Sequence, residues 1–144
     1  MSDALGPRAQ PGTTSRGLGR VLVALYATLA LAATARAAVQ LATRFDEAPL
    51  AYLLSAVAAV IYVVATAALV RGGRAGRRTA TVALTVELVG VLVVGTLSLA
   101  DRAAFPDETV WSVYGLGYGF LPLALPVVGL LWLRRQARAE AAAG

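Results

Sequence analysis

The sequence predicts an all-α, polytopic membrane protein: a bundle of four transmembrane helices with both termini in the cytoplasm. Three observations predict this fold. The chain is 58% hydrophobic with a mean hydropathy of +0.70, whereas soluble domains are about 45–50% apolar even when Gly is counted. Its apolar residues form four long blocks, which is the membrane pattern. Most of its Arg residues gather at one side of these blocks.

The four blocks define the domain organisation. Residues 1–19 are rich in Gly and Pro and are expected to form a disordered cytoplasmic tail. Residues 136–144 are expected to form a second cytoplasmic tail, whose Ala, Arg, Gln and Glu residues favour an extension of the fourth helix along the membrane surface. Residues 20–135 form the transmembrane domain between the tails. Blocks of this length cross a hydrocarbon core of about 30 Å, with some tilt. The predicted helices cover about residues 20–43, 48–70, 79–100 and 109–133.

The first block contains Arg36 and allows a second interpretation. In that interpretation residues 21–31 are the apolar core of a signal peptide, and residues 33–35, Ala-Thr-Ala, are its cleavage site. We favour a retained helix, because apolar sequence continues beyond Arg36 and no hydrophilic domain follows for export. Arg36 itself is interpreted as an anchor at the outer headgroups, with the outer wall of a polar pocket as the alternative.

Arg placement predicts the orientation in the membrane. The two tails and the junction between the second and third helices carry most of the Arg residues, whereas Arg44 and Arg102 lie at the opposite ends of the helices. Because cytoplasmic segments carry an excess of positive charge, we expect a multi-pass protein of the bacterial inner (cell) membrane with both termini inside. Anionic lipid headgroups are the expected partners of Arg71, Arg74, Arg77 and Arg78.

The composition excludes several classes of chemistry. All thirteen basic residues are Arg, and the chain has no His and no Cys, which removes imidazole and thiol catalysis, disulfides and Cys/His metal sites. We therefore predict no catalytic residue, metal or cofactor. Asp107 and Glu108 are interpreted as helix caps rather than as metal ligands together with Asp101. The net charge of +5 is assigned to lipid contact and not to nucleic acid.

Glu87 is the residue that most needs an explanation, because placing a carboxyl group inside the bilayer costs free energy. Such a residue almost always faces the interior of the helix bundle or a water-filled cavity. Two interpretations stay open. Glu87 is either a protonated acid that fixes helix packing through a hydrogen bond, or a proton or cation site. Prolines in the fourth block leave backbone carbonyls without their helical donors, and these carbonyls lie near the expected depth of Glu87. The candidate polar partners are Tyr118, Pro122, Tyr62 and Arg36.

The fourth block carries signals for helix packing. Gly115 and Gly119 form a Gly-x-x-x-Gly pair, which lets another helix approach closely. Aromatic residues from Trp111 onward are typical of a belt at the membrane interface. Pro122 and Pro126 predict a kinked or locally unwound helix. The second block has a polar and small-residue stripe that is predicted to face the bundle, namely Ser55, Ala59, Tyr62 and Thr66.

The fourth block also carries a resemblance. It contains Pro-Asp at position 106, Thr-Val-Trp-Ser at 109, Tyr-Gly-x-Gly-Tyr-Gly at 114, Pro-Leu-x-Leu-Pro at 122 and Gly-Leu-x-Trp-Leu at 129. On these motifs the chain resembles a family of small actinobacterial four-helix integral membrane proteins of unknown function. The resemblance implies a bacterial membrane protein and no particular activity. Small multidrug-resistance transporters also combine four helices with a membrane Glu, but in their first helix, whereas Glu87 lies in the third.

These observations predict a non-enzymatic membrane protein. We expect it to pack as a homo-oligomer, or with a larger membrane-protein partner, as an accessory or assembly component. The alternative is a small proton-coupled transporter that uses Glu87 as its membrane-embedded carboxylate.

Overall fold

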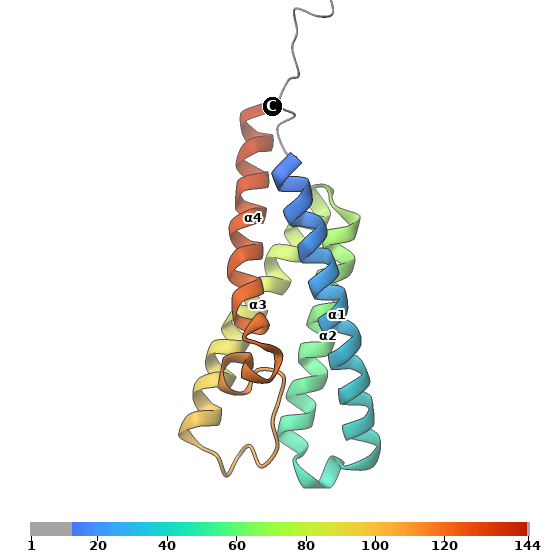
Figure 1. The fold of residues 1–144 in the computed structure, drawn as a ribbon, viewed down its shortest axis with the longest axis vertical. Helices are drawn as coiled ribbons and strands as arrows, with labels where there is room; N and C mark the ends of the chain where they lie inside the picture. The colour runs from blue at the N-terminus through green and yellow to red at the C-terminus, as the bar shows by residue number, and fades with distance from the viewer. Residues whose placement is uncertain (1–12, 144) are drawn as a thin grey trace, which may run out of the picture.

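The structure, a computed structural model, describes residues 13–143, which are helical and contain no strand (Figure 1). The α-helices are α1 (Thr13–Thr43), α2 (Pro49–Arg71), α3 (Gly73–Ala100) and α4 (Leu121–Ala143). Two short 3₁₀ helices lie between them, η2 (Phe45–Glu47) and η3 (Ser112–Tyr118).

The helices are those of a multi-pass membrane protein. Each of α1, α2 and α3 is long and apolar enough to cross a membrane. A fourth crossing results if η3 and α4, which meet at an angle of 96°, are counted as one broken span. On its own α4 is short, because its apolar part ends at Leu133 and measures about 20 Å at the helical rise of 1.5 Å per residue, less than a hydrocarbon core of about 30 Å.

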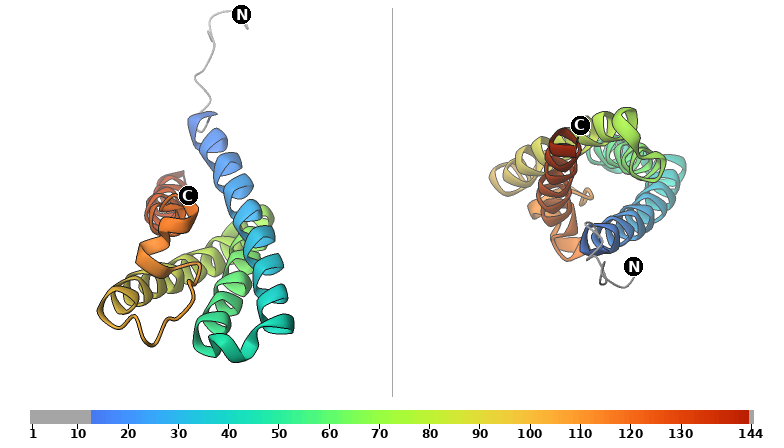
Figure 2. Two further views of the ribbon diagram at one scale, coloured as in Figure 1. Left: turned by 60° about the horizontal axis from the view of Figure 1, so that its bottom comes forward. Right: turned by 90° about the horizontal axis from the view of Figure 1, so that it is seen from above.

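The α-helices stand side by side in the order α1, α2, α3, α4, and the view from above shows them arranged in a ring (Figure 2). The start of α1, the junction of α2 and α3, and the end of α4 lie at one end, called here the terminal end (Figure 1). The turn at residues 44–48 and the beginning of segment 101–111 lie at the other end, called here the loop end, and this segment then runs back toward the middle of the molecule (Figure 1).

On α2, alanines occupy most of the inward face and large apolar residues cover the outside. The buried positions of α2 include Ala51, Ala58 and Ala65, while Val60 and other Val and Leu side chains point outward. This distribution is typical of membrane helices, which associate through close packing because lipid is as apolar as Leu. The predicted inward stripe of α2 is confirmed, since Ser55, Ala59 and Tyr62 are buried and Thr66 is partly buried.

The first helix begins earlier than predicted. Residues 13–19, which were assigned to a disordered tail, already belong to α1, and residues 1–12 lie outside the described part of the chain. Gly19 supplies a reason, because a Cβ at this position would lie 2.8 Å from the ring of Trp132 on α4. The glycine thus lets α4 rest against the first turns of α1, and helices in proteins are stabilised mainly by such packing.

The third helix also begins earlier, at Gly73 instead of residue 79. Gly72 and Gly73 have φ angles of 63° and 69°, a backbone conformation that favours glycine, and they reverse the chain directly after α2. The Arg-rich junction can therefore form the first turns of α3, since Arg and Ala favour helix.

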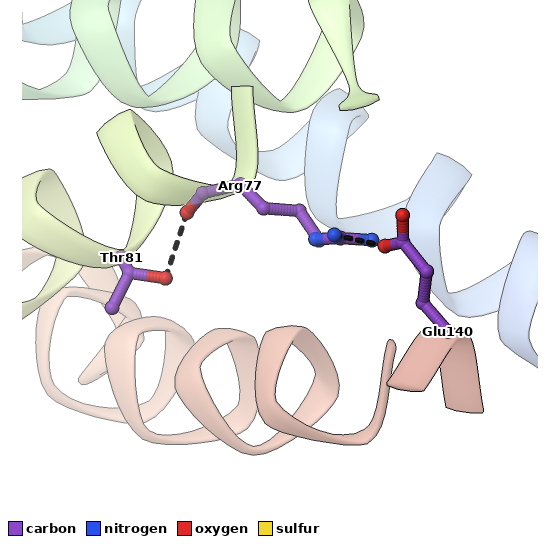
Figure 3. Close-up of polar contacts among 3 residues, drawn as sticks. All are labelled: Arg77, Thr81 and Glu140. Carbon is purple, nitrogen blue, oxygen red and sulfur yellow. Dashed lines mark hydrogen bonds and ion pairs between the residues drawn. The ribbon is translucent and has the colours of Figure 1, made fainter. Parts of the chain in front are cut away.

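The end of α4 is helical as far as Ala143 and is tied to α3. Arg77 forms an ion pair with Glu140, and Thr81 Oγ1 donates a hydrogen bond of 2.7 Å to the Arg77 carbonyl (Figure 3). The segment predicted as a tail from residue 136 therefore continues α4 and contacts the Arg-rich start of α3. Gly144 lies outside the described part of the chain.

The helix predicted for residues 109–133 is interrupted, since α4 begins only at Leu121. The predicted local unwinding next to Pro122 is therefore confirmed, but the predicted start of the helix at residue 109 is wrong. Pro122 lacks an N–H and restricts the residue before it, so the helix cannot extend smoothly toward its N-terminal side. Backbone groups that lose their helical hydrogen bonds at this interruption bond to other groups. The Val113 N–H, for example, donates a hydrogen bond of 2.9 Å to Ser98 Oγ. Positive φ angles between 49° and 84° occur at Val113, Tyr114, Gly115, Gly119 and Phe120.

Candidate functional site

Glu87 lies in the middle of the 28-residue α3 and is completely buried. The hydroxyl of Tyr26, on α1, donates a hydrogen bond of 2.7 Å to Glu87 Oε2. Tyr26 is itself fully buried. The carboxyl group is therefore held at mid-depth by a side chain from a different helix.

A second hydrogen bond crosses the interior next to the first. Trp111, just before η3, donates its indole N–H to the hydroxyl of Tyr62, on α2, at 2.9 Å. The rings of Tyr26 and Tyr62 lie with their centroids 6.2 Å apart and tilted by 53°. We call these four residues, Tyr26, Tyr62, Glu87 and Trp111, the central cluster.

The central cluster links helices that are not neighbours. α1 packs against α2 and α4 but its backbone does not approach that of α3, and the backbone of α2 does not approach that of α4. The Tyr26–Glu87 bond joins the first of these diagonal pairs. The Trp111–Tyr62 bond joins α2 to the segment that leads into α4. Tyrosine and tryptophan suit this task, because each has a large apolar body and a polar tip that needs a partner when buried.

Glycines on α3 make room for the segment before α4. A Cβ at Gly90 would lie 2.6 Å from the ring of Trp111, and a Cβ at Gly95 would overlap the ring of Tyr114. These two positions allow the aromatic rings to rest on the backbone of α3. Trp111 is therefore almost completely buried and does not belong to an aromatic belt at the membrane interface.

Several buried polar atoms remain unpaired in residues 13–143. Glu87 Oε1 has no hydrogen-bond partner there, nor do Ser55 Oγ and Gln40 Oε1. Buried polar groups are paired in the large majority of cases, so each exception needs an explanation. The unpaired Glu87 oxygen retains its capacity to carry a proton or to accept a hydrogen bond.

The structure distributes the four predicted partners of Glu87 over different places. Tyr62 packs against Tyr26 in the central cluster, and Tyr118 packs at the edge of the hydrophobic core. Pro122 is buried next to Gly115. Arg36 lies at the loop end, where it donates a hydrogen bond of 3.3 Å to the Glu108 carbonyl.

Sequence reasoning missed Tyr26, which donates to Glu87, although a signal was present. Tyr26 is a phenol inside the first apolar block, as Tyr62 is in the second. A buried phenol needs a polar partner, and Glu87 is the carboxylate of the apolar blocks. Matching these groups by depth leaves Tyr26 and Tyr62 as the two candidate donors to Glu87.

The Gly115–Gly119 pair does not form the predicted helix-packing motif. Both residues lie outside the α-helices, with φ angles of 84° and 63°. A Cβ at Gly115 would meet the ring of Pro122 at 2.7 Å, whereas a Cβ at Gly119 would meet open space. These glycines therefore permit the turn into α4 instead of the approach of another helix.

A second polar group lies at the loop end, around Asp107. Tyr52 donates its hydroxyl to Asp107 Oδ2 at 2.8 Å, and the Glu108 N–H donates to Oδ1 at 2.7 Å. The hydrogen bond from Tyr52 lowers the pKa of Asp107, and Arg36 and Arg44 contribute in the same direction. Asp107 thus stabilises the loop. The prediction that Asp107 and Glu108 cap a helix is wrong, because η3 has no side-chain cap. Within residues 13–143 no three acidic, His or Cys side chains gather in a metal-binding group.

No protein-family model, curated protein or solved structure matches this chain.

Proposed function

We propose that this chain is a non-enzymatic membrane component that packs with itself, or with a larger membrane protein, as an accessory or assembly subunit. The observation that carries this proposal is the central cluster, in which two hydrogen bonds join diagonally opposed elements at mid-depth. Hydrogen bonds between helices stabilise one arrangement of a membrane bundle. A fixed arrangement keeps the outer Val and Leu surface constant for a partner helix to recognise.

In this proposal the chain forms a four-helix bundle with four spans, the last of which consists of η3 and α4. Both termini lie in the cytoplasm, because the Arg-rich terminal end matches the positive-inside rule. The first helix is retained and not cleaved, since Tyr26 on α1 supplies the partner of Glu87. The exposed Arg71, Arg74 and Arg78 contact anionic headgroups, and Arg77 adds its charge to them.

The resemblance of residues 106–133 to the actinobacterial membrane-protein family supports a bacterial cell membrane as the location. The abundance of Arg at one end supports the same location, because the cytoplasmic leaflet carries anionic lipids.

The test is mild solubilisation from native membranes at endogenous abundance, followed by mass spectrometry of the proteins that co-purify. A stoichiometric membrane protein, or a defined homo-oligomer, is the expected result. A monomer that co-purifies with nothing would overturn the assembly role. Tyr26→Phe is expected to lower the yield of the complex, while Thr28→Val on the same helix, whose hydroxyl donates only to its own backbone, serves as the matched control.

Proton-coupled transport through Glu87 is a second candidate function. It is favoured by the unpaired Oε1 of a fully buried carboxyl group, because ionisable residues inside membranes commonly form proton relays. Glu87→Gln distinguishes the two candidates, since it retains the shape and the acceptor oxygen but does not titrate. Proton flux is measured with a pH-sensitive dye inside vesicles that contain the purified protein. If Glu87→Gln abolishes proton flux but leaves protein yield and assembly unchanged, Glu87 functions in transport. If the variant changes neither proton flux nor assembly, the assembly role is supported.

A further inference from the structure

The interior has a polar half and an apolar half, with the central cluster between them. Apart from Glu87, every buried polar residue of the described chain lies between the central cluster and the loop end. They come from α1, α2, α3 and the start of η3, together with the buried segment just before η3. These residues are Gln40, Ser55, Ser98, Thr109 and Ser112.

The half toward the terminal end is apolar. Its fully or almost fully buried side chains come from all four α-helices, and none of them has a polar side-chain atom. They include Leu22, Ala65, Ala68, Ala80, Leu84 and Leu133. Leu84 lies one helical turn from Glu87 on the same helix and packs against Gly129 of α4. An apolar layer thus separates Glu87 from the terminal end.

The unpaired atoms follow the same division. Ser55 Oγ and Gln40 Oε1 lie in the polar half, and Glu87 Oε1 lies where the two halves meet. A buried polar atom without a partner is costly, and ordered water is the usual partner when several polar groups surround the same space. The polar half offers such groups, whereas the apolar half offers none.

The inward face of α2 connects the loop end to the central cluster. Tyr52, Ser55 and Tyr62 are all fully buried and occupy one side of the helix. Tyr52 is bonded to the part-exposed Asp107 at the surface, and Tyr62 packs against the ring of Tyr26, which holds Glu87. Between Ser55 and Tyr62 the helix rises by about 10 Å, a distance that a short file of water molecules can bridge.

We propose that the polar half holds a file of ordered water molecules that runs from Asp107 past Ser55 to Glu87 Oε1. Through it Glu87 exchanges protons with the loop end and is closed to the terminal end. The inference goes beyond both proposed functions, because one-sided proton access neither requires net transport nor depends on a partner protein. Should the chain transport protons, the file supplies one half of the route, and opening of the apolar layer supplies the other.

The test is solid-state NMR of the full-length, isotope-labelled protein in lipid vesicles, with magnetisation transferred from water and resolved by residue. The expected result is fast transfer to Ser55 and Glu87, similar to that of Asp107, and transfer several times slower to Leu84 and Leu133. Slow transfer to both Ser55 and Glu87 would show a dry interior and overturn the proposal. Equally fast transfer to Leu84 would overturn its one-sidedness.

Two substitutions on α2 locate the file. Ser55→Ala removes the unpaired hydroxyl in the polar half and is expected to slow water transfer to Glu87 several-fold. Thr66→Val removes a hydroxyl on the other side of Tyr62 that already donates to the Tyr62 carbonyl, and it is expected to leave the transfer unchanged. If Ser55→Ala does not change the rate of magnetisation transfer from water to Glu87, the assigned route past Ser55 is contradicted. The measurement on the unsubstituted protein stands even if Ser55→Ala folds poorly.

Discussion

At the scale of single residues, three tyrosines on α1 and α2 determine how the interior is held. Tyr26 donates to Glu87, Tyr52 donates to Asp107, and Tyr62 accepts from Trp111. In each case the ring is fully buried while the hydroxyl reaches a group on a distant part of the chain. The same residue type therefore joins elements that are far apart in the sequence.

Tyr26→Phe is expected to destabilise the protein by about 1–3 kcal/mol, because it leaves Glu87 Oε2 buried without its donor. Tyr26→Phe combined with Glu87→Leu is expected to recover part of this loss, since removing both partners leaves no unsatisfied group. Equilibrium unfolding in detergent micelles measures both changes. Additive losses in the double variant would mean that the two side chains are not coupled.

Tyr52→Phe is expected to raise the pKa of Asp107 toward the ordinary value of about 3.9, because the hydroxyl that lowers it is removed. A carboxyl group with a lowered pKa stabilises the folded state above its unfolded pKa, and this contribution is lost as the pH falls through the folded pKa. The variant should therefore lose less stability than the unsubstituted protein on acidification below about pH 4.

The Asp107 titration is measured by the ¹³C chemical shift of its carboxyl carbon, together with thermal unfolding at each pH. Tyr114→Phe is the control, because the Tyr114 hydroxyl at the same end contacts Thr96 and not Asp107. An unchanged Asp107 titration in Tyr52→Phe would contradict the assigned hydrogen bond.

At the scale of elements, the segment before α4 is the feature that departs from regular helix. Its turn has positive φ angles at residues that include Val113 and Tyr114, where side chains make this conformation unfavourable. The side of the turn that faces α3 is held by protein, with Trp111 and Tyr114 on the glycines of α3 and backbone N–H groups bonded to serine hydroxyls. Its other side, at Leu116 and Phe120, is exposed. Irregular backbone at membrane depth is tolerated where protein buries it.

Gly90→Ala is expected to destabilise the protein, because the new Cβ would lie 2.6 Å from the Trp111 ring and the bond to Tyr62 limits how far the ring can move. Overpacking of this kind costs about 1–3 kcal/mol. Gly17→Ala is the matched control, since Gly17 lies in α1 with nothing within 4 Å and gains helix propensity of up to about 1 kcal/mol.

Thermal unfolding and the tryptophan emission spectrum measure both glycine variants. Gly90→Ala should shift the emission to longer wavelength as Trp111 loses its buried position, and Gly17→Ala should not. Equal stability of the two variants would mean that α3 does not support the Trp111 ring as described.

At the scale of the whole molecule, two asymmetries run along the same axis. Arg residues concentrate at the terminal end, and buried polar residues concentrate toward the loop end. The first asymmetry concerns the surface, where we propose that the Arg side chains contact anionic lipid headgroups. The second concerns the interior, where polar groups need partners. Together they distinguish the two ends of the molecule both outside and inside.

The orientation is testable with cysteine, because the chain contains none. Cysteine introduced at the exposed Ala103, in the loop before η3, is expected to react with a membrane-impermeant maleimide in intact cells. Cysteine introduced at the exposed Ala75, at the start of α3, is expected to react only after permeabilisation. The expectation follows from the positive-inside rule, and the reverse labelling pattern would contradict it.

The sequence by itself determined the helical fold and the membrane character, because long apolar blocks have few alternatives in a bilayer, where backbone groups must pair internally. It also determined the inward face of α2, since residues at helical spacing share one side, and it singled out Glu87, since a carboxyl group in an apolar block is costly. These are local properties that each segment carries alone.

The tertiary structure decided which groups meet and where the fourth block is interrupted. Tyr26 and Glu87 are 61 positions apart, and no property of either segment specifies that their helices lie diagonally across one interior. The break before Leu121 depends on Trp111 and Tyr114 fitting the glycines of α3. In both cases the free energy that selects the observed structure comes from contacts between segments. The helix propensity and the hydrophobic periodicity of a single segment carry no information about such contacts.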